Sequence, residues 1–257
     1  MKRLQQVGWL RTMFYFWSAL KDQYHMNIFS YLASLSWYFS DIFKFKNLQQ
    51  NKHAQIRFSS LYPYLVDKTT TTYLEPTYFF QDTWAAKKIF HSNPTKHFDV
   101  GSNVKSMAII AQSIPVTLID IRPIELKLES LSFIEGSILK LPFQDNSIES
   151  LSSLCVVEHI GLGRYGDPID SFGTEKAVKE LQRVLKKNGN LYISVPIDRE
   201  NKVYFNAHRS FTKEYFLSLF PKMALVEEKY IYGKELFDSY DAQKGFGTGL
   251  YHLRKKK

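Results

Sequence analysis

The segment VVEHIGLGRYGDPIDSFG, residues 156–173, is the richest part of the sequence in side chains that can do chemistry. Its glycines and its proline disfavour a regular helix, so its charged side chains belong to a loop, where functional groups are common. His159 is predicted to be a general base, because its unperturbed pKa lies near neutrality. The alternative is a surface loop in which His159 bonds a strand end. The predicted substrate-binding residues of this loop are Arg164, Tyr165 and Asp170.

No metal is predicted in this loop, because His159, Asp167 and Asp170 lack the tight spacing of metal ligands.

A second polar segment, YFNAHRSF, covers residues 204–211. His208 competes with His159 for the role of base, and both are retained as candidate catalytic residues. Arg209 or Arg164 can hold a phosphate, and Asn206 is a further candidate for substrate binding. The alternative interpretation is the start of a helix before KEYFLSLF.

The segment FDVGSNV, residues 98–104, is typical of a turn that binds a nucleotide. Gly101 directly follows a predicted strand, where a residue without Cβ lets the backbone approach a ligand. The usual second glycine is replaced by Asn103, which tolerates positive φ and is expected to take its place. An ordinary corner between a strand and a helix fits the same letters.

Asp120 ends the next predicted strand, VTLIDI, 21 residues after Asp99. A carboxylate at this spacing can accept hydrogen bonds from both hydroxyls of a ribose. Ser137 and Ile138 follow the third predicted strand and can meet the edge and the face of adenine. Together these residues predict a cofactor that contains a nucleoside.

Strands and helices alternate from residue 76 onwards, which predicts an α/β fold with right-handed crossovers. The predicted strands include KHFDVG, VTLIDI, LSFIEGS, SIESLSSLCVV, NLYISVP and LVEEKYIY. We expect a doubly wound, mostly parallel sheet of seven strands. The helix GTEKAVKELQRVLKKNG is expected to run until Gly189 stops it. Residues 76–257 are predicted to form the main domain.

Residues 1–75 are predicted to be a helical extension and a connection, rich in aromatic residues. Apolar residues recur at helical spacing in two sets: Leu10, Met13, Phe14, Trp17 and Leu20, then Ile28, Tyr31, Leu32, Leu35 and Tyr38. These helices are expected to pack on the main domain or to form a homodimer with a second copy of the chain. The alternative is a peripheral helix in a membrane interface.

The charge of +9 favours an anionic partner, either a phosphorylated small molecule or a nucleic acid. The basic residues form no stripe, so nucleic acid is the weaker prediction. The single Cys155 excludes an internal disulfide, which is typical of a cytoplasmic protein. No stretch reaches the ~20 apolar residues of a transmembrane helix.

Residues 97–232 resemble the class I S-adenosylmethionine-dependent methyltransferases. The strings DVGSNV, LIDIRP, VVEHIGLGRYGDP, KELQRVLKKNGNLYISVP and FNAHRSF resemble more narrowly a bacterial branch known as a domain of unknown function (DUF268-like). Members of this branch are often associated with surface polysaccharide synthesis. The resemblance implies a Rossmann-like fold, S-adenosyl-L-methionine as cofactor and S-adenosyl-L-homocysteine as its product.

The resemblance also implies positions for the cofactor. Asp99, Gly101 and Ser102 would lie beside its methionine part, Asp120 would bind the ribose and Ile121 would pack on adenine. Ser137 stands where many methyltransferases have an aspartate that bonds the adenine amino group. Val157 and Glu158 would lie under the sulfonium.

The sequence therefore predicts an O-methyltransferase that acts on a sugar hydroxyl, with an anionic nucleotide sugar as substrate, in capsule or other surface polysaccharide synthesis. Two alternatives stay open: a scaffold subunit that binds the cofactor without catalysis, and a methyltransferase for another small molecule or for RNA. The dense polar loop argues against a scaffold, and the absence of a basic stripe argues against RNA.

Overall fold

The structure, a computed structural model, describes residues 28–50, 53 and 55–257. The chain divides into two compact units, Met1–Tyr73 and Leu74–Lys257, and each is described by itself. In the described parts, no helix combines the length and the apolar character that crossing a membrane requires.

The N-terminal unit contains the helix α2 (Ile28–Leu48) and a single turn, η2 (Phe58–Ser60). The prediction of a helix over the second apolar set is confirmed. The first apolar set, Leu10 to Leu20, lies outside the described residues. Lys68 pairs with Asp41 at 2.7 Å and lies 4.5 Å from the ring centre of Trp37, which ties the later chain of this unit to α2. Dimerisation and membrane contact through this unit stay predictions.

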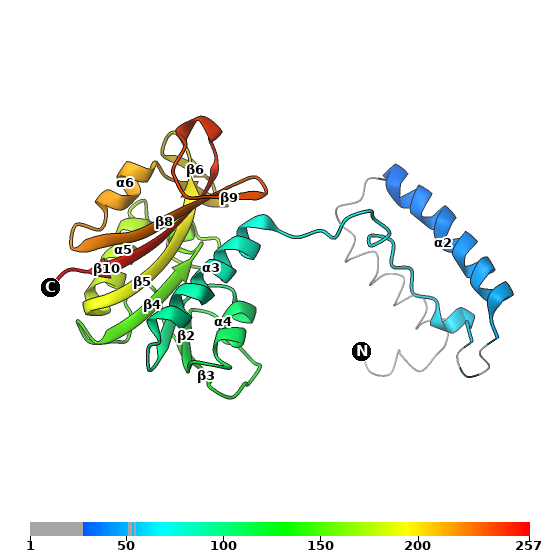
Figure 1. The fold of residues 1–257 in the computed structure, drawn as a ribbon, viewed down its shortest axis with the longest axis horizontal. Coiled ribbons are helices and arrows are strands. Elements are labelled where there is room, and N and C mark those ends of the chain that lie inside the picture. The colour runs from blue at the N-terminus through cyan, green and yellow to red at the C-terminus, as the bar shows by residue number, and fades with distance from the viewer. Residues whose placement is uncertain (1–27, 51–52, 54) are drawn as a thin grey trace. The chain divides into compact units, whose positions relative to one another are not determined.

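The second unit is an α/β fold around one sheet of eight strands, ordered β3-β2-β1-β4-β5-β10-β8-β9 (Figure 1). The first five strands in this order run parallel, and β10, β8 and β9 are antiparallel to their neighbours. The strands are β1 (His97–Val100), β2 (Val116–Asp120), β3 (Leu131–Glu135), β4 (Ile148–Leu154), β5 (Leu185–Ile197), β8 (Met223–Tyr232), β9 (Glu235–Phe237) and β10 (Gly247–Lys255). The α/β prediction is confirmed, with one strand more than the seven expected.

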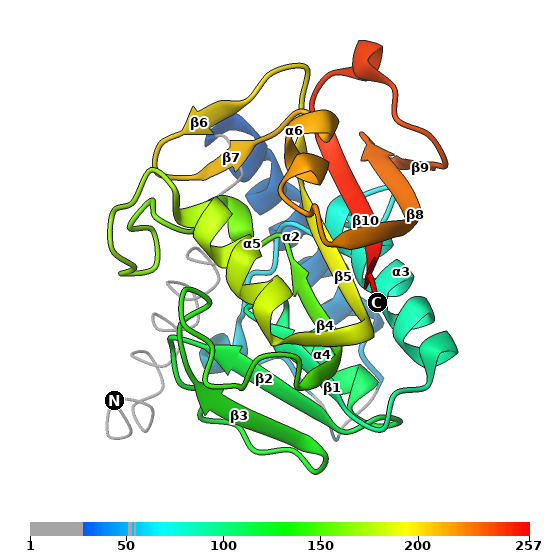
Figure 2. The ribbon, with the colours of Figure 1, turned by 90° about the vertical axis from the view of Figure 1, so that its left-hand side faces the viewer.

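Helices cover both faces of the sheet (Figure 2). The helices α3 (Pro76–Ser92) and α4 (Val104–Ile110) pack on one face, and α5 (Gly173–Val184) and α6 (Lys213–Ser218) on the other. Successive strand residues point to opposite faces, so Leu118 joins the core under α3 and α4 while Ile119 joins the core under α5. Both residues are buried, as expected for a strand covered on both sides.

The end of α5 differs from the prediction, because the helix stops at Val184 and β5 begins at Leu185. Leu185 is fully buried and pairs with Ile148 of β4, so burial of its side chain in the sheet outweighs the helical propensity of the following lysines. Gly189 lies at an irregular part of this pairing. A Cβ there would come within 2.8 Å of the Lys186 carbonyl, so this glycine permits a tight bend in the strand.

The strand order indicates where a ligand is expected to bind. The chain crosses from β1 outward to β2 and β3, and then returns to β4 on the other side of β1. Loops that follow β1 and β4 therefore diverge at the carboxyl edge, and ligands bind in such a crevice in open α/β sheets. A hairpin, β6 (Lys202–Tyr204) and β7 (His208–Ser210), stands over this edge where the sequence indicated only a connection.

Candidate functional site

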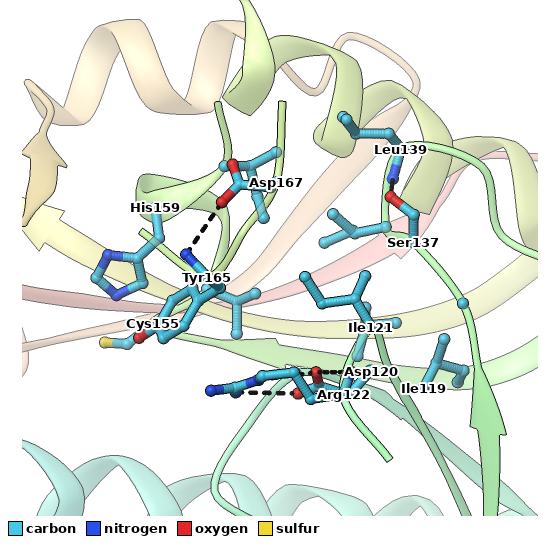
Figure 3. Close-up of a pocket in the computed structure, with 16 residues that line it drawn as sticks. Ile119, Asp120, Ile121, Arg122, Ser137, Leu139, Cys155, His159, Tyr165 and Asp167 are labelled. Carbon is cyan, nitrogen blue, oxygen red and sulfur yellow. Dashed lines mark hydrogen bonds and ion pairs between the residues drawn. The ribbon is translucent and has the colours of Figure 1, made fainter. Parts of the chain in front are cut away.

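A cleft with an empty volume of about 620 Å³ lies at the carboxyl ends of β1 to β4 (Figure 3). Every one of these four strands contributes through the loop that follows it. The predicted residues that line the cleft are Gly101, Asp120, Ile121, Ser137, Ile138, His159 and Tyr165.

The turn after β1 brings backbone to the cleft wall. Gly101 has φ of 73°, and a Cβ there would lie 3.0 Å from a methyl group of Val156, so a larger residue would be both strained and crowded. Asn103 does not supply a second positive φ, contrary to expectation. Its φ is −63°, and its side chain caps α4 by accepting from the Lys105 amide at 3.0 Å.

Asp99 supports this turn from beneath. It is fully buried, does not line the cleft, and accepts hydrogen bonds from the amide and the hydroxyl of Ser102 at 3.0 and 2.6 Å. Ser152 of β4 donates a further bond to it. Burial raises the pKa of Asp99 to about 6, although these hydrogen bonds favour its charged form. Asp99 therefore holds the turn in shape from within the core. Ser102, which bonds Asp99, is the residue of this pair that lines a cavity.

Asp120 presents its carboxylate to the cleft beside Arg122. The Arg122 amide donates to Asp120 at 2.8 Å, and the guanidinium contacts the two carboxylate oxygens at 3.3 and 3.4 Å (Figure 3). Arg122 also lies 4.6 Å from the ring centre of Tyr165. Across the cleft, Ser137 accepts from the Leu139 amide at 3.2 Å. The cleft thus joins the Asp120 carboxylate to apolar surface, which suits a sugar attached to a flat ring system.

The residues that follow β4 also line the cleft. Cys155 has a positive φ of 52°, and its thiol donates to Gln81 at 2.9 Å. Burial raises the pKa of Cys155 well above its usual value, so the thiol is neutral. Cys155 and Val156 line the cleft. Val157, which was predicted to lie under the sulfonium of a cofactor, is fully buried and does not line the cleft.

A second cavity, with an empty volume of about 1000 Å³, adjoins the cleft. Gly101, Cys155, His159 and Tyr165 line both cavities, so the two spaces meet at the end of β4. The other predicted residues that line the second cavity are Ser102, Glu158, Arg164 and His208. Sequence reasoning missed Glu75 and Thr77 at the start of α3, and Phe246 and Thr248 near the start of β10.

His159 is held in one orientation. Its Nδ1 donates to the Ala207 carbonyl of the hairpin at 2.6 Å, and Arg164 donates to the same carbonyl at 2.8 Å. Because the carbonyl only accepts, Nδ1 carries the proton and the neutral ring has its lone pair at Nε2. Burial lowers the pKa of His159 to about 4. The second histidine, His208, lies between Tyr204 and Phe246, and burial lowers its pKa as well.

Glu158 lies at the base of the second cavity with about 1% of its surface exposed. Its Oε1 is 3.7 Å from His159 Nε2, whereas its buried Oε2 has no hydrogen-bond partner in the described part of the chain. Burial raises the pKa of Glu158 to about 8. A buried carboxyl with a free oxygen is costly in a core and typical of a site that handles a ligand.

Three predicted substrate-binding residues take other positions and line neither cavity. Arg209 is buried and donates to the carbonyls of Ile160 and Asp170 at 2.6 and 3.1 Å, so its guanidinium fastens the loop after β4. The Asp170 carboxylate pairs with Lys176 at 2.5 Å and accepts from a loop amide at 2.9 Å. Asn206 is exposed in the turn of the hairpin.

Part of the sequence matches a known protein family. Residues 121–230, less than half of the chain, match the family described as "Caenorhabditis protein of unknown function, DUF268". No curated protein matches the sequence at a significant level.

Several solved structures share the fold. The 1,6-didemethyltoxoflavin-N1-methyltransferase of Burkholderia thailandensis, with bound S-adenosylhomocysteine, has a TM-score of 0.51 and 15% identity over 74% of this chain and 94% of that one. The N-methyltransferase NodS of Bradyrhizobium japonicum, also with S-adenosylhomocysteine, has a TM-score of 0.52 and 13% identity over 76% and 92%. The [4+2]-cyclase SpnF has a TM-score of 0.52 and 14% identity over 68% and 79%.

These likenesses show that the second unit has the class I methyltransferase fold, as the sequence predicted. Because one of the similar structures is a cyclase, the fold by itself leaves the reaction open, and the site must carry the argument for function.

Proposed function

We propose that this chain is an S-adenosylmethionine-dependent methyltransferase. The observation that supports it most is the pair of adjoining cavities at the switch point of the sheet, joined along Gly101, Cys155, His159 and Tyr165. Methyl transfer needs two reactants held end to end, with the donor methyl and the acceptor atom meeting where their pockets join. A cleft and an adjoining cavity with a common wall meet that need.

The cleft residues fit the cofactor. Gly101 leaves room where a Cβ would crowd Val156, and Asp120 offers carboxylate oxygens to ribose hydroxyls. Ile121 and Ile138 supply apolar faces for adenine, and the Ser137 hydroxyl lies at the same wall. When bound, the cofactor supplies a methyl group already activated by a sulfonium, so the protein's task is to position an acceptor and remove its proton.

The second cavity is the proposed place for the acceptor. His159 and His208, the two residues predicted as bases, both line it, and so does Arg164. We propose that the acceptor is a sugar hydroxyl on an anionic nucleotide sugar. The cationic Arg164 at the cavity and the net charge of +9 support an anionic ligand. The assignment to a sugar used in capsule or surface polysaccharide synthesis rests only on the resemblance of VVEHIGLGRYGDP and the accompanying strings.

The experiment that tests this function has two steps. Calorimetry with S-adenosylmethionine and with S-adenosylhomocysteine measures cofactor binding, and binding of both is expected. A panel of nucleotide sugars is then incubated with methyl-labelled cofactor and followed by mass spectrometry for a labelled product. Failure of both cofactors to bind would refute the proposal. Binding without transfer to any member of the panel would contradict the nucleotide-sugar acceptor.

A further inference from the structure

The second cavity contains a carboxyl group whose position suits proton transfer. Glu158 is about 1% exposed, yet it lines the cavity, and its Oε2 has no partner among the described residues. A buried polar oxygen that the protein leaves unpaired destabilises the folded state. The cost is offset if a ligand supplies the missing hydrogen bond, and the cavity that Glu158 lines is the proposed acceptor cavity.

On the basis of the methyltransferase function proposed above, we propose that Glu158 is the residue that takes the proton from the acceptor. The acceptor oxygen bonds to the methyl carbon, and the carbon–sulfur bond breaks with its electron pair left on sulfur. The acceptor proton passes to the Glu158 carboxylate, which afterwards returns it to solvent through the open cavity. No oxidant, metal or further reactant is needed to balance this step.

The two histidines are less suited to this task. His159 has Nδ1 fixed on the Ala207 carbonyl, and its Nε2 lies 3.7 Å from Glu158 Oε1, so its free nitrogen faces the carboxyl. His208 stacks between Tyr204 and Phe246, at ring-centre distances of 5.0 and 5.8 Å, so its ring faces are covered by aromatic side chains.

The surroundings of Glu158 set its charge. The titratable and charged groups that face it are Cys155 at the end of β4, Tyr78 on α3, and His159 and Arg164 in its own loop. The thiol and the phenol are neutral, so Arg164 is the one cation in this set, and burial dominates. The pKa of about 8 leaves the carboxyl largely neutral at pH 7 in the free protein. A sulfonium nearby would lower that pKa, because an opposite charge favours the carboxylate.

The first test follows this carboxyl directly and needs no acceptor. Protein labelled with ¹³C at the glutamate carboxyls is titrated by NMR, and Glu158→Gln identifies the signal. We expect a pKa of about 8 in the free protein, a value of about 7 or lower with S-adenosylmethionine, and little change with S-adenosylhomocysteine, which lacks the sulfonium charge. Equal pKa shifts with both ligands, or no shift with S-adenosylmethionine, would overturn the proposal, because the carboxyl would then lie away from the sulfonium.

The second test is single-turnover methyl transfer to the nucleotide sugar that the panel identifies. Glu158→Gln keeps the shape of the side chain but cannot accept the proton, so the rate is expected to fall at least ~100-fold with cofactor affinity nearly unchanged. His159→Asn retains a donor toward Ala207 and is expected to cost ~10-fold or less. The reverse order of the two variants would overturn the proposal.

Glu175→Gln is the matched control. Glu175 also has an unpaired buried oxygen, but it bonds Tyr215 and lines neither cavity, so this variant is expected to keep the wild-type rate. Failure of the wild-type protein to bind the cofactor would refute the methyltransferase function itself. Normal binding with a fully active Glu158→Gln variant would refute only the role of Glu158.

Discussion

Asp120→Ala tests the cofactor cleft most directly. One oxygen of Asp120 accepts from the Arg122 amide at 2.8 Å, whereas the contacts with the Arg122 guanidinium are longer, at 3.3 and 3.4 Å. The Arg122 side chain is 59% exposed, so water replaces these longer contacts at little cost. Both carboxylate oxygens are therefore able to accept from two ribose hydroxyls when the cofactor binds.

The expected loss follows from those two hydrogen bonds. A hydrogen bond to a charged group contributes about 1.5–3 kcal/mol. The Asp120 side chain is 19% exposed, so solvent screens it in part and the lower value is appropriate. Two bonds then contribute about 3 kcal/mol, which weakens S-adenosylhomocysteine binding about a hundredfold at ~1.4 kcal/mol per factor of ten. Calorimetry at fixed pH and salt measures this change.

Three further variants control the interpretation. Asp120→Asn retains one acceptor without the charge and is expected to weaken binding about tenfold. Arg122→Ala removes only the competing guanidinium, so affinity should stay unchanged or rise. Asp145→Ala removes an equal charge from a carboxylate that pairs with Arg183 and lines neither cavity. The ribose assignment is refuted if Asp120→Ala binds S-adenosylhomocysteine within about threefold of wild type while Asp145→Ala also binds it with normal affinity.

Two further predictions concern buried charges. Because burial raises the pKa of Asp99 to about 6, this carboxyl binds more protons in the folded protein than in the unfolded chain between about pH 4 and pH 6, so its own contribution to the free energy of unfolding should fall by about 3 kcal/mol as pH rises through this window. Urea denaturation of wild type and Asp99→Asn checks it, and parallel pH curves for the two proteins would contradict it. Arg209→Met leaves two loop carbonyls without their donor and should lower the free energy of unfolding by about 3 kcal/mol, while the exposed Arg254→Met should change it little. If Arg209→Met leaves the free energy of unfolding unchanged, the guanidinium does not stabilise the fold, and the predicted role of Arg209 in ligand binding is favoured.

The sequence predicted the cleft because strand order along the chain carries spatial information. Gly101, Asp120 and Ser137 each follow a strand, and the carboxyl ends of parallel strands meet at one edge of a sheet. Local residue types then indicate what each loop offers. This reasoning needs no long-range contact, and the structure places all three residues along the same cleft.

The roles of the charged residues around that cleft depend on contacts that the sequence does not display. Arg209 was predicted to bind substrate because it is a cation near a histidine, yet its partners are backbone carbonyls 39 and 49 residues earlier in the chain. A carbonyl has no sequence signature. Similarly, Phe246 and Thr248 reach the second cavity from the chain before β10 and from its start, far from every motif. Their inclusion follows only from the packing of the last strand on the sheet.

The adjacent residues Glu158 and His159 show why residue type alone misjudges basicity at this site. In water, histidine is the stronger base and the natural choice near neutral pH. Burial disfavours the charged form of either residue, so it lowers the pKa of His159 to about 4 and raises that of Glu158 to about 8. The order of basicity is thereby reversed within one dipeptide. A pH–rate profile of the wild-type enzyme distinguishes the two, because a rate that rises with a midpoint near 4 would identify His159. A midpoint near or somewhat below 8 would identify Glu158, since a base acts in its unprotonated form and a bound sulfonium lowers the pKa of a neighbouring carboxyl.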